Sequence, residues 1–297
     1  MAILTVNSHV AVGHVGNSAT VLPLQCLGFE AWPVHTTLLS NHPGHGQAHG
    51  QAVAPAVVAE VLAGIAARGG LARLEAVLSG YLASPETGAA VLGTVAAAKA
   101  AAPAALFCCD PVLGDAREGL YVAEALARWI ADEAVAAADI VTPNRFELAY
   151  LSGRPADSEP QALAAARALI ARGPRLVLAT SIDAGDAAAG GGRIATLAVT
   201  ADAAWRVTTP KLASRAKGAG DVLAALFLAH TLKGGDAGAA LDLAVSSVFG
   251  LIAAAGPEAL DLPVVAAAAQ ITRPGTRFHA EVMPNRPPDG RREPRIP

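Results

Sequence analysis

The sequence predicts an α/β protein built on a mostly parallel central sheet with helices on both faces. The main observation is that short apolar runs of strand length alternate along the chain with longer runs whose apolar residues recur at helical spacing. The second is composition: 53% of the 297 residues are hydrophobic, so the chain can bury a large core, and we expect one domain over residues 1–283. Residues 284–297 are rich in proline and arginine and are predicted to form a mobile tail.

The strands are predicted from short apolar runs that are bounded by polar or turn-forming residues. The run at residues 106–109 ends at Asp110-Pro111, because a proline restricts the residue before it and has no amide hydrogen to donate to a sheet. Two later runs, at residues 194–199 and 204–207, are expected to be antiparallel. The remaining predicted strands are residues 3–6, 30–37, 76–78, 140–141 and 176–179.

The helices are predicted from apolar residues spaced three or four positions apart. The first, at residues 18–27, stops at Gly28, and the second, at 53–67, ends near Gly69. The others are residues 88–101, 122–137, 159–172, 221–232 and 239–254. Since ligands of such folds bind outside the carboxyl ends of the strands, we expect the site in the loops that follow them.

Composition excludes several classes of partner. The 25 acidic residues outnumber the 22 basic ones, so the net charge of −3 provides no basic surface for a nucleic acid or an anionic membrane. Polar residues such as His230 and Asp242 interrupt the most apolar segments, which argues against a membrane span. Residues 1–9 lack the basic region of a signal peptide, so we expect a cytoplasmic protein. In that compartment the three cysteines (Cys26, Cys108 and Cys109) are predicted to be reduced core residues.

The most informative stretch is Lys217-Gly218-Ala219-Gly220-Asp221, which runs directly into an apolar helix. Two glycines let successive N–H groups point into one space, and the helix N-terminus adds partial positive charge, so this segment is a predicted anion cradle. We expect Asp221 at the first position of the helix, beside the cradle. A carboxylate there is suited to take the proton of an alcohol that attacks a phosphoryl group. The alternative is an ordinary N-cap aspartate after a glycine turn.

Two further clusters follow neighbouring strands. Asp110 lies in Asp110-Pro111-Val112-Leu113-Gly114-Asp115, and Glu147 lies in Thr142-Pro143-Asn144-Arg145-Phe146-Glu147. Mg²⁺ takes oxygen ligands, often one or two carboxylates together with substrate phosphates, so Asp110 and Glu147 are the candidate metal residues. The alternative is local: Asp-Pro favours turns, and Asn144 with Glu147 three residues later resembles a capping box.

Six of the eight histidines lie before residue 50, including His42, His45 and His49. Their spacing permits a metal site, but the segment is rich in glycine and polar residues and is equally typical of a loop that closes over a ligand. Tyr81 follows Ser79-Gly80 at a strand end. It is placed either to stack on a planar ligand or to serve as a rim or core aromatic.

The order of these motifs resembles that of the pyridoxal kinases, vitamin B6 salvage enzymes of the ribokinase-like superfamily. Apart from the clusters above, the resemblance lies in Asn7-Ser8-His9, Gly13-His14-Val15-Gly16-Asn17, Ser40-Asn41-His42, Leu78-Ser79-Gly80-Tyr81-Leu82, Leu151-Ser152-Gly153-Arg154 and Thr180-Ser181. It spans residues 2 to about 280. It implies a ribokinase-like three-layer α/β/α sandwich, a homodimer, and ATP-dependent phosphorylation of the 5′-hydroxymethyl group of pyridoxal, with pyridoxine and pyridoxamine as further substrates.

The resemblance also assigns roles by position. It implies that Asp221 is the base, that Gly218, Ala219 and Gly220 hold the transferring phosphoryl group, and that a B6 vitamer contacts Ser8, Val15, His42 and Tyr81. It implies Mg²⁺, held through Asp110 and Glu147, and K⁺ as a further cation. The nucleotide and its phosphates are assigned to Asp110, Asp115, Thr142, Asn144, Glu147, Thr180, Ser181, Thr209, Pro210, Lys211, Leu212, Gly218 and Gly220.

The chain departs from its relatives before and after the Ser-Asn-His motif. Many of them have glutamine and phenylalanine where this chain has Leu38 and Leu39, and threonine where it has Pro43. These changes bear on ring recognition and on the choice of vitamer. Three alternatives stay open from the sequence: a hydroxymethylpyrimidine kinase of the same superfamily, a carrier that binds a vitamer or nucleotide without turnover, and a metal-binding protein built on the histidine cluster.

Overall fold

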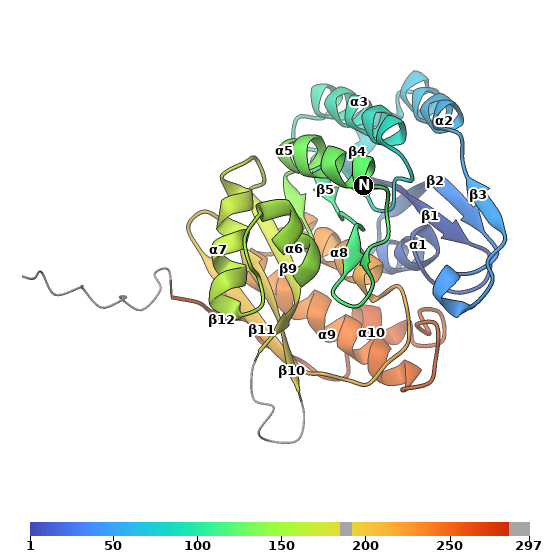
Figure 1. The fold of residues 1–297 in the computed structure, drawn as a ribbon. Coiled ribbons are helices and arrows are strands. Elements are labelled where there is room, and N and C mark those ends of the chain that lie inside the picture. Colours follow the sequence, from blue (N-terminus) through green and yellow to red (C-terminus); the bar gives the residue numbers. More distant parts are fainter. Residues whose placement is uncertain (185–191, 285–297) are drawn as a thin grey trace, which may run out of the picture.

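The computed structural model describes residues 1–184 and 192–284, and it places one large sheet between two layers of helices (Figure 1). Of the tail predicted at residues 284–297, all but the first residue lie outside the described residues. From one edge of the sheet to the other, the strands are β12 (Glu281–Val282), β11 (Ala204–Pro210), β10 (Arg193–Val199), β9 (Leu176–Asp183), β8 (Ile140–Val141), β5 (Leu106–Cys109), β4 (Leu74–Ser79), β1 (Ala2–Val10), β2 (Glu30–Leu39) and β3 (Gly50–Ala52).

The centre of the sheet is parallel, as predicted. Each neighbouring pair from β2 through β1, β4, β5 and β8 to β9 runs parallel. The pairs β9–β10, β10–β11, β11–β12 and β2–β3 are antiparallel, which confirms the antiparallel strands expected at 194–199 and 204–207. A separate two-stranded hairpin, β6 (Gly114–Asp115) and β7 (Gly119–Leu120), stands at the carboxyl end of β5.

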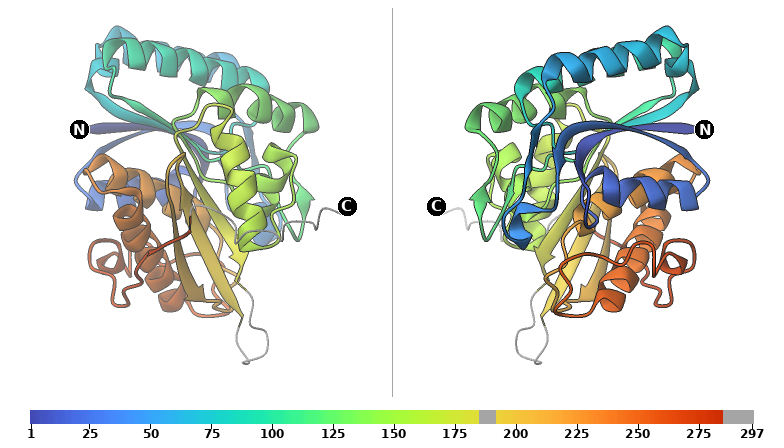
Figure 2. Two further views of the ribbon diagram at one scale, coloured as in Figure 1. Left: turned by 90° about the vertical axis from the view of Figure 1, so that its left-hand side faces the viewer. Right: turned by 90° about the vertical axis from the view of Figure 1, so that its right-hand side faces the viewer.

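Helices cover both faces of the sheet, as the two side views show (Figure 2). One layer contains α2 (Pro55–Ala67), α3 (Pro85–Ala101), α4 (Glu124–Trp129), α5 (Val135–Ala137), α6 (Arg145–Ser152) and α7 (Glu159–Ile170). The other contains α1 (Asn17–Cys26), α8 (Ala219–Leu232), α9 (Ala237–Ala255) and α10 (Ala269–Thr272). Short 3-10 turns occur at η1 (Pro43–His45) and η2 (Gly70–Arg73).

The strands of the sheet contribute side chains to two hydrophobic cores, because alternate side chains point to opposite faces. In β1, Leu4 packs in the core beneath α2 and α3, whereas its neighbour Ile3 packs in the core beneath α1 and α8. In β5, Cys109 packs in the first of these cores and Cys108 in the second. Both are buried and free of disulfides. The prediction of reduced core cysteines is confirmed for this pair, whereas Cys26 is only partly buried.

Several elements differ from the prediction, including the helix expected at 88–101, which begins at Pro85. The helix expected at 122–137 is interrupted, since a π-helical turn (Ile130–Ala134) separates α4 from α5. The helix expected at 221–232 begins two residues earlier, at Ala219, so Asp221 is its third residue and not its first. The helix α6 was not predicted, because its eight residues are too few to show a clear helical period.

The helix α9 is, by length and composition alone, apolar enough to cross a membrane. However, 61% of its most apolar window is buried inside the structure, where Leu241, Ala244 and Leu251 pack in the core beneath α8. Such burial is typical of the central helix of a globular domain.

Candidate active site

A cavity of about 500 Å³ opens at the carboxyl ends of the parallel strands, where the sequence analysis expected the site. It collects side chains from the ends of β1, β2, β4, β5, β8 and β9 and from the N-terminus of α8. The predicted site residues that line it are Ser8, Val15, His42, Tyr81, Asp110, Asp115, Thr142, Asn144, Glu147, Thr180, Gly218, Gly220 and Asp221. Segments more than 200 residues apart in the chain thus meet in one space.

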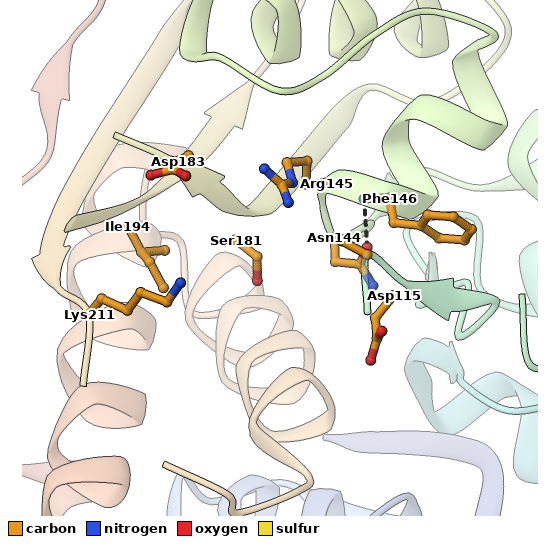
Figure 3. A pocket seen from close by; sticks show the side chains of 9 residues that line it. Asp115, Asn144, Arg145, Phe146, Ser181, Asp183, Ile194 and Lys211 are labelled. Carbon is orange, nitrogen blue, oxygen red and sulfur yellow. Dashed lines mark hydrogen bonds between the residues drawn. The ribbon is translucent and has the colours of Figure 1, made fainter. Parts of the chain in front are cut away.

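A second cavity, of about 280 Å³, adjoins the first (Figure 3). Figure 3 shows Asp183, Ile194 and Lys211 on one side of it, Asp115, Asn144 and Phe146 on the other, and Ser181 between them. Asp115 and Asn144 line both cavities, so the two spaces lie next to each other at this point. Of the predicted site residues, only Ala219, Thr209, Pro210 and Leu212 line neither cavity.

The carboxylate of Asp221 is held from two sides. The side-chain amide of Asn7 donates a hydrogen bond of 2.9 Å to Oδ1, and the backbone N–H of Gly16 donates a second one to the carboxylate. Desolvation in the cavity raises the pKa of Asp221, and these two donors oppose that rise. The residue is therefore an oriented carboxylate with greater basicity than an aspartate in water, which suits a general base.

The turn before α8 can be made only by glycine. Gly218 has a φ of +92°, and a Cβ on it would lie 1.9 Å from the carbonyl oxygen of His14. This close approach places Gly218 and Gly220 on the cavity wall, beside Asp221. The first N–H groups of α8 have no partner within their own helix, so they can bind an anion in the cavity. The glycine turn and the helix start therefore lie where the sequence predicted them, and anion binding there stays a prediction.

Asp110 and Thr142 follow the neighbouring strands β5 and β8, and Oγ1 of Thr142 donates to Oδ1 of Asp110. Desolvation raises the pKa of Asp110 well above its ordinary range, and the negative charges of Glu147 and Asp221 raise it further. Three carboxyl groups thus converge on one cavity and repel one another when they are all ionised.

Glu147 and Asn144 form the capping box of α6, which confirms the local interpretation of this motif. Oε2 of Glu147 accepts from the N–H of Asn144 at 2.9 Å, and Oε1 accepts from the N–H of Leu113 at 2.8 Å. The side-chain amide of Asn144 in turn donates to the carbonyl of Gly114. Glu147, only 3% exposed, therefore ties the loop after β5 to α6 while it also lines the cavity.

The donor set suits a divalent cation that completes its shell with substrate and water. In the described part of the chain, no three or more His, Cys, Asp or Glu side chains are grouped to hold a metal by themselves. Two carboxylates with raised pKa values, Asp110 and Glu147, fit Mg²⁺, which typically takes one or two protein carboxylates along with phosphates. The positive charge would also relieve the repulsion among the carboxylates.

The histidine cluster is arranged as a capped turn. Nδ1 of His42 accepts from the N–H of Gly44 and caps η1, and the rings of His42 and His45 lie 5.3 Å apart. Burial lowers the pKa of His42, and the charges of Lys217 and His45 lower it further. Among the described residues, these histidines are not part of a group of three or more metal-ligating side chains.

Several cavity residues have no counterpart among the predicted ones. Asn7 belongs to the Asn7-Ser8-His9 motif, but the resemblance assigns no role to this asparagine. In the structure, however, its side-chain amide contacts Asp221. Lys217 and Tyr121 line the larger cavity, and no sequence pattern marks Tyr121. Of the departures noted above, Leu39 and Pro43 line this cavity, whereas Leu38 points outward and is 47% exposed.

Comparison with protein families and sequences gives a consistent result. The model of the phosphomethylpyrimidine kinase family matches residues 16–260. The pyridoxal kinase PdxY of Rubrobacter xylanophilus is 46% identical over 280 residues, which cover 93% of this chain and 95% of that protein. The PdxY of Deinococcus radiodurans is 46% identical over 286 residues, which cover 94% and 95%.

Solved structures show the same fold. The pyridoxal kinase of Leishmania donovani in complex with ADP and pyridoxamine matches with a TM-score of 0.86 at 27% identity, over 95% of this chain and 99% of that one. Its complex with ADP and pyridoxine also has a TM-score of 0.86, at 26% identity and the same coverage. These matches confirm the predicted ribokinase-like fold and the resemblance seen in the motifs.

Proposed function

The chain belongs to the phosphomethylpyrimidine kinase family, and we propose that it is the member of that family that phosphorylates pyridoxal with ATP. The observation that carries this proposal is the pairing of Asp221 with the glycine turn before α8, at the floor of a cavity that also holds Ser8 and Tyr81. The high identity to pyridoxal kinases over nearly the whole chain supports pyridoxal as the acceptor.

The larger cavity offers what a pyridine ring with polar substituents requires. Val15 is an apolar wall, Tyr81 supplies an aromatic face, and the hydroxyl of Ser8 supplies a hydrogen-bonding group for the ring. In this arrangement the 5′-hydroxymethyl group of the vitamer points at Asp221. Pyridoxine and pyridoxamine carry the same group, so we include them as further substrates.

The chemical step needs a base and a site for negative charge. As the hydroxyl oxygen attacks the γ-phosphorus of ATP, its proton passes to Asp221, and the bond to the bridging oxygen of ADP breaks. The N–H groups at the start of α8, beside Gly218 and Gly220, stabilise the charge on the transferring phosphoryl group. Since the raised pKa of Asp221 increases its basicity, the cavity environment favours this proton transfer.

We assign the nucleotide to the smaller cavity, between Lys211 on one side and Asn144 on the other, with its phosphates directed toward Asp115 and the larger cavity. Asp110 and Glu147 would hold Mg²⁺, which supplies charge neutralisation at the phosphates. Thr142 positions Asp110 through its hydroxyl and lines the same wall.

Three further features belong to the proposal. A K⁺ requirement and a cytoplasmic location are proposed from the similarity to pyridoxal kinases. We also propose a homodimer. A second copy would cover the outer strand β3 and the apolar side chains of Val57 and Val61 on α2, each of which is nearly half exposed.

The test is a direct assay of acceptor choice. The pure chain is incubated with ATP, Mg²⁺ and K⁺, and pyridoxal, pyridoxine, pyridoxamine and hydroxymethylpyrimidine are offered separately. ADP and the phosphorylated product are both followed, so that simple ATP hydrolysis is distinguished from transfer. We expect efficient transfer to pyridoxal, and omission of K⁺ from a matched reaction measures the monovalent requirement.

Each other outcome has a distinct meaning. Preference for hydroxymethylpyrimidine would contradict pyridoxal as the acceptor. It would leave the role of Asp221 as the base unchanged, because that reaction needs the same alcohol chemistry on a different ring. Tight vitamer binding without ADP formation would instead support the carrier alternative.

A further inference from the structure

Asn7 lies at the carboxyl end of β1, is only 3% exposed, and contacts three functional segments at once. Its Oδ1 accepts the backbone N–H of Ser8 at 2.8 Å and that of Tyr81 at 2.9 Å. Its Nδ2 donates to Oδ1 of Asp221 at 2.9 Å. One side chain therefore joins the base to the backbone of two residues assigned to the vitamer.

The orientation of this amide follows from its partners. Two N–H groups face one end of it, and only oxygen can accept from both. The other end must then be the NH₂ group, and it faces a carboxylate, which only accepts. A rotation of 180° about the last side-chain bond would set donors against donors and oxygen against oxygen. The network thus selects a single orientation and holds Asp221 in one position.

The chain leaves space for this amide. A Cβ on Gly80 would lie 2.2 Å from Nδ2 of Asn7, so any larger residue at position 80 would displace the group that contacts Asp221. Gly80 also donates its N–H to the carbonyl of Val6, which fixes the end of β4 against β1 directly below Asn7. The lack of a side chain at Gly80 therefore leaves room for the hydrogen bond between Asn7 and Asp221.

We propose that Asn7 is a positioning residue for phosphoryl transfer: it fixes the carboxylate of Asp221 and couples it to the backbone of Ser8 and Tyr81. This inference rests on the proposed function. It assigns Asn7 no contact with the reacting atoms. Because reaction requires the base within hydrogen-bonding reach of the hydroxyl, a displacement of about 1 Å is enough to lower the rate roughly 10²-fold.

The discriminating variant is Asn7→Asp, which has nearly the same shape. An aspartate at position 7 still accepts from the N–H groups of Ser8 and Tyr81, but it sets a carboxylate oxygen against Asp221 in place of a donor. We expect kcat to fall about 10²-fold, while the KM for ATP stays within about twofold. A kcat within threefold of the wild-type value would overturn the proposal.

A double-variant cycle separates positioning from a general structural effect. If Asn7 acts through Asp221, Asn7→Asp should cost nothing further in an Asp221→Asn background, and the double variant should be as slow as Asp221→Asn alone. Equal losses in both backgrounds would contradict the proposal. Gly80→Ala keeps every polar group, and it should likewise lower kcat in the wild-type background but not in the Asp221→Asn background. It is the variant to use if Asn7→Asp does not fold.

Thermal stability tests the inference without activity. Asn7→Asp places two carboxylates together and should lower Tm, whereas the added Asp221→Asn change supplies an amide donor and should restore it. Failure of the wild-type chain to phosphorylate pyridoxal would refute the proposed function alone. Failure of Asp221→Asn to restore Tm would refute the contact on which the inference depends.

Discussion

Thr142 donates the hydrogen of its Oγ1 hydroxyl to Oδ1 of Asp110 at 2.8 Å and so links the first residues beyond two neighbouring parallel strands. Both side chains line the larger cavity, and Thr142 is 5% exposed. A hydrogen bond to the charged form of a carboxylate favours ionisation, and here it opposes the desolvation that raises the pKa of Asp110. The link therefore keeps Asp110 both oriented and available as a cation ligand.

Replacing Thr142 by valine should raise the Mg²⁺ requirement. Valine keeps the shape of the side chain but lacks the donor, and hydrogen bonds to charged groups contribute about 1.5–3 kcal/mol. We expect the Mg²⁺ concentration for half-maximal activity to rise roughly tenfold or more, while ADP binding without Mg²⁺ changes little. The measurement is a Mg²⁺ titration of initial rates. Weaker ADP binding with an unchanged titration would instead make Thr142 a direct nucleotide contact.

Asp110→Asn should change how stability depends on pH. Because the folded-state pKa of Asp110 lies above its unfolded value near 4, the folded chain binds more protons between the two values, and its stability falls as pH rises. An asparagine does not titrate, so this fall is absent from the variant. Without Mg²⁺, we expect similar Tm values near pH 4 and a Tm for Asp110→Asn about 3 °C or more above wild type at pH 8.

The histidines with lowered pKa values, such as His42 and His230, act with the opposite sign, because stability that depends on a neutral buried histidine grows as pH rises. They are present in both proteins and cancel in the comparison. Thermal unfolding between pH 4 and 8.5 therefore reports the contribution of Asp110 together with its repulsion from Glu147 and Asp221. Parallel curves for the two proteins would contradict a raised pKa at this position.

Asp221→Asn should abolish most of the activity while leaving nucleotide binding intact. The amide has the shape of the carboxylate and can still accept from Asn7, but it cannot take a proton at neutral pH. We expect kcat to fall 10²-fold or more and ADP affinity to change less than threefold. Asp132→Asn, an exposed position in the π-helical turn, is the matched control. A near-normal rate in Asp221→Asn would remove its role as the base.

The sequence predicted the central sheet well because its buried strands contain continuous apolar runs, as at β5 and in the first half of β9. It also located the glycine turn before α8, since the backbone at Gly218 can be formed only by glycine. It misplaced Asp221 by two positions because Ala219 and Gly220 carry no apolar periodicity, although their backbone is already helical.

Other parts of the site depend on contacts between distant segments. Tyr121 reaches the larger cavity only because the hairpin of β6 and β7 brings its backbone back to Leu113, and no local pattern encodes that return. Val112 lines the same wall with a φ of +48°, a conformation that a β-branched residue avoids unless its surroundings impose it. Propensity argues against that conformation, so sequence reasoning alone does not reach it.

Tyr81→Ala should weaken vitamer binding selectively. The side chain lines the cavity, whereas its backbone N–H is held by Asn7, so truncation should leave the local fold in place. Loss of an aromatic contact and its buried area is expected to raise the KM for pyridoxal roughly tenfold, with the KM for ATP unchanged. Tyr81→Phe is the control that keeps the ring. If Tyr81→Ala instead unfolds the chain, the ring belongs to the core and not to the ligand site.

Position 39 should affect the choice of vitamer, and position 38 should not. The two leucines are adjacent in β2 and point to opposite sides: Leu39 lines the larger cavity, whereas Leu38 is 47% exposed. Leu39→Phe enlarges a wall beside the ring and should shift the ratio of kcat/KM between pyridoxal and pyridoxamine severalfold. Leu38→Gln, which introduces the residue of many relatives, should leave that ratio unchanged. The measurement is kcat/KM for each vitamer. Equal shifts from both variants would mean that the strand moves as a whole and that the cavity wall does not select the substrate.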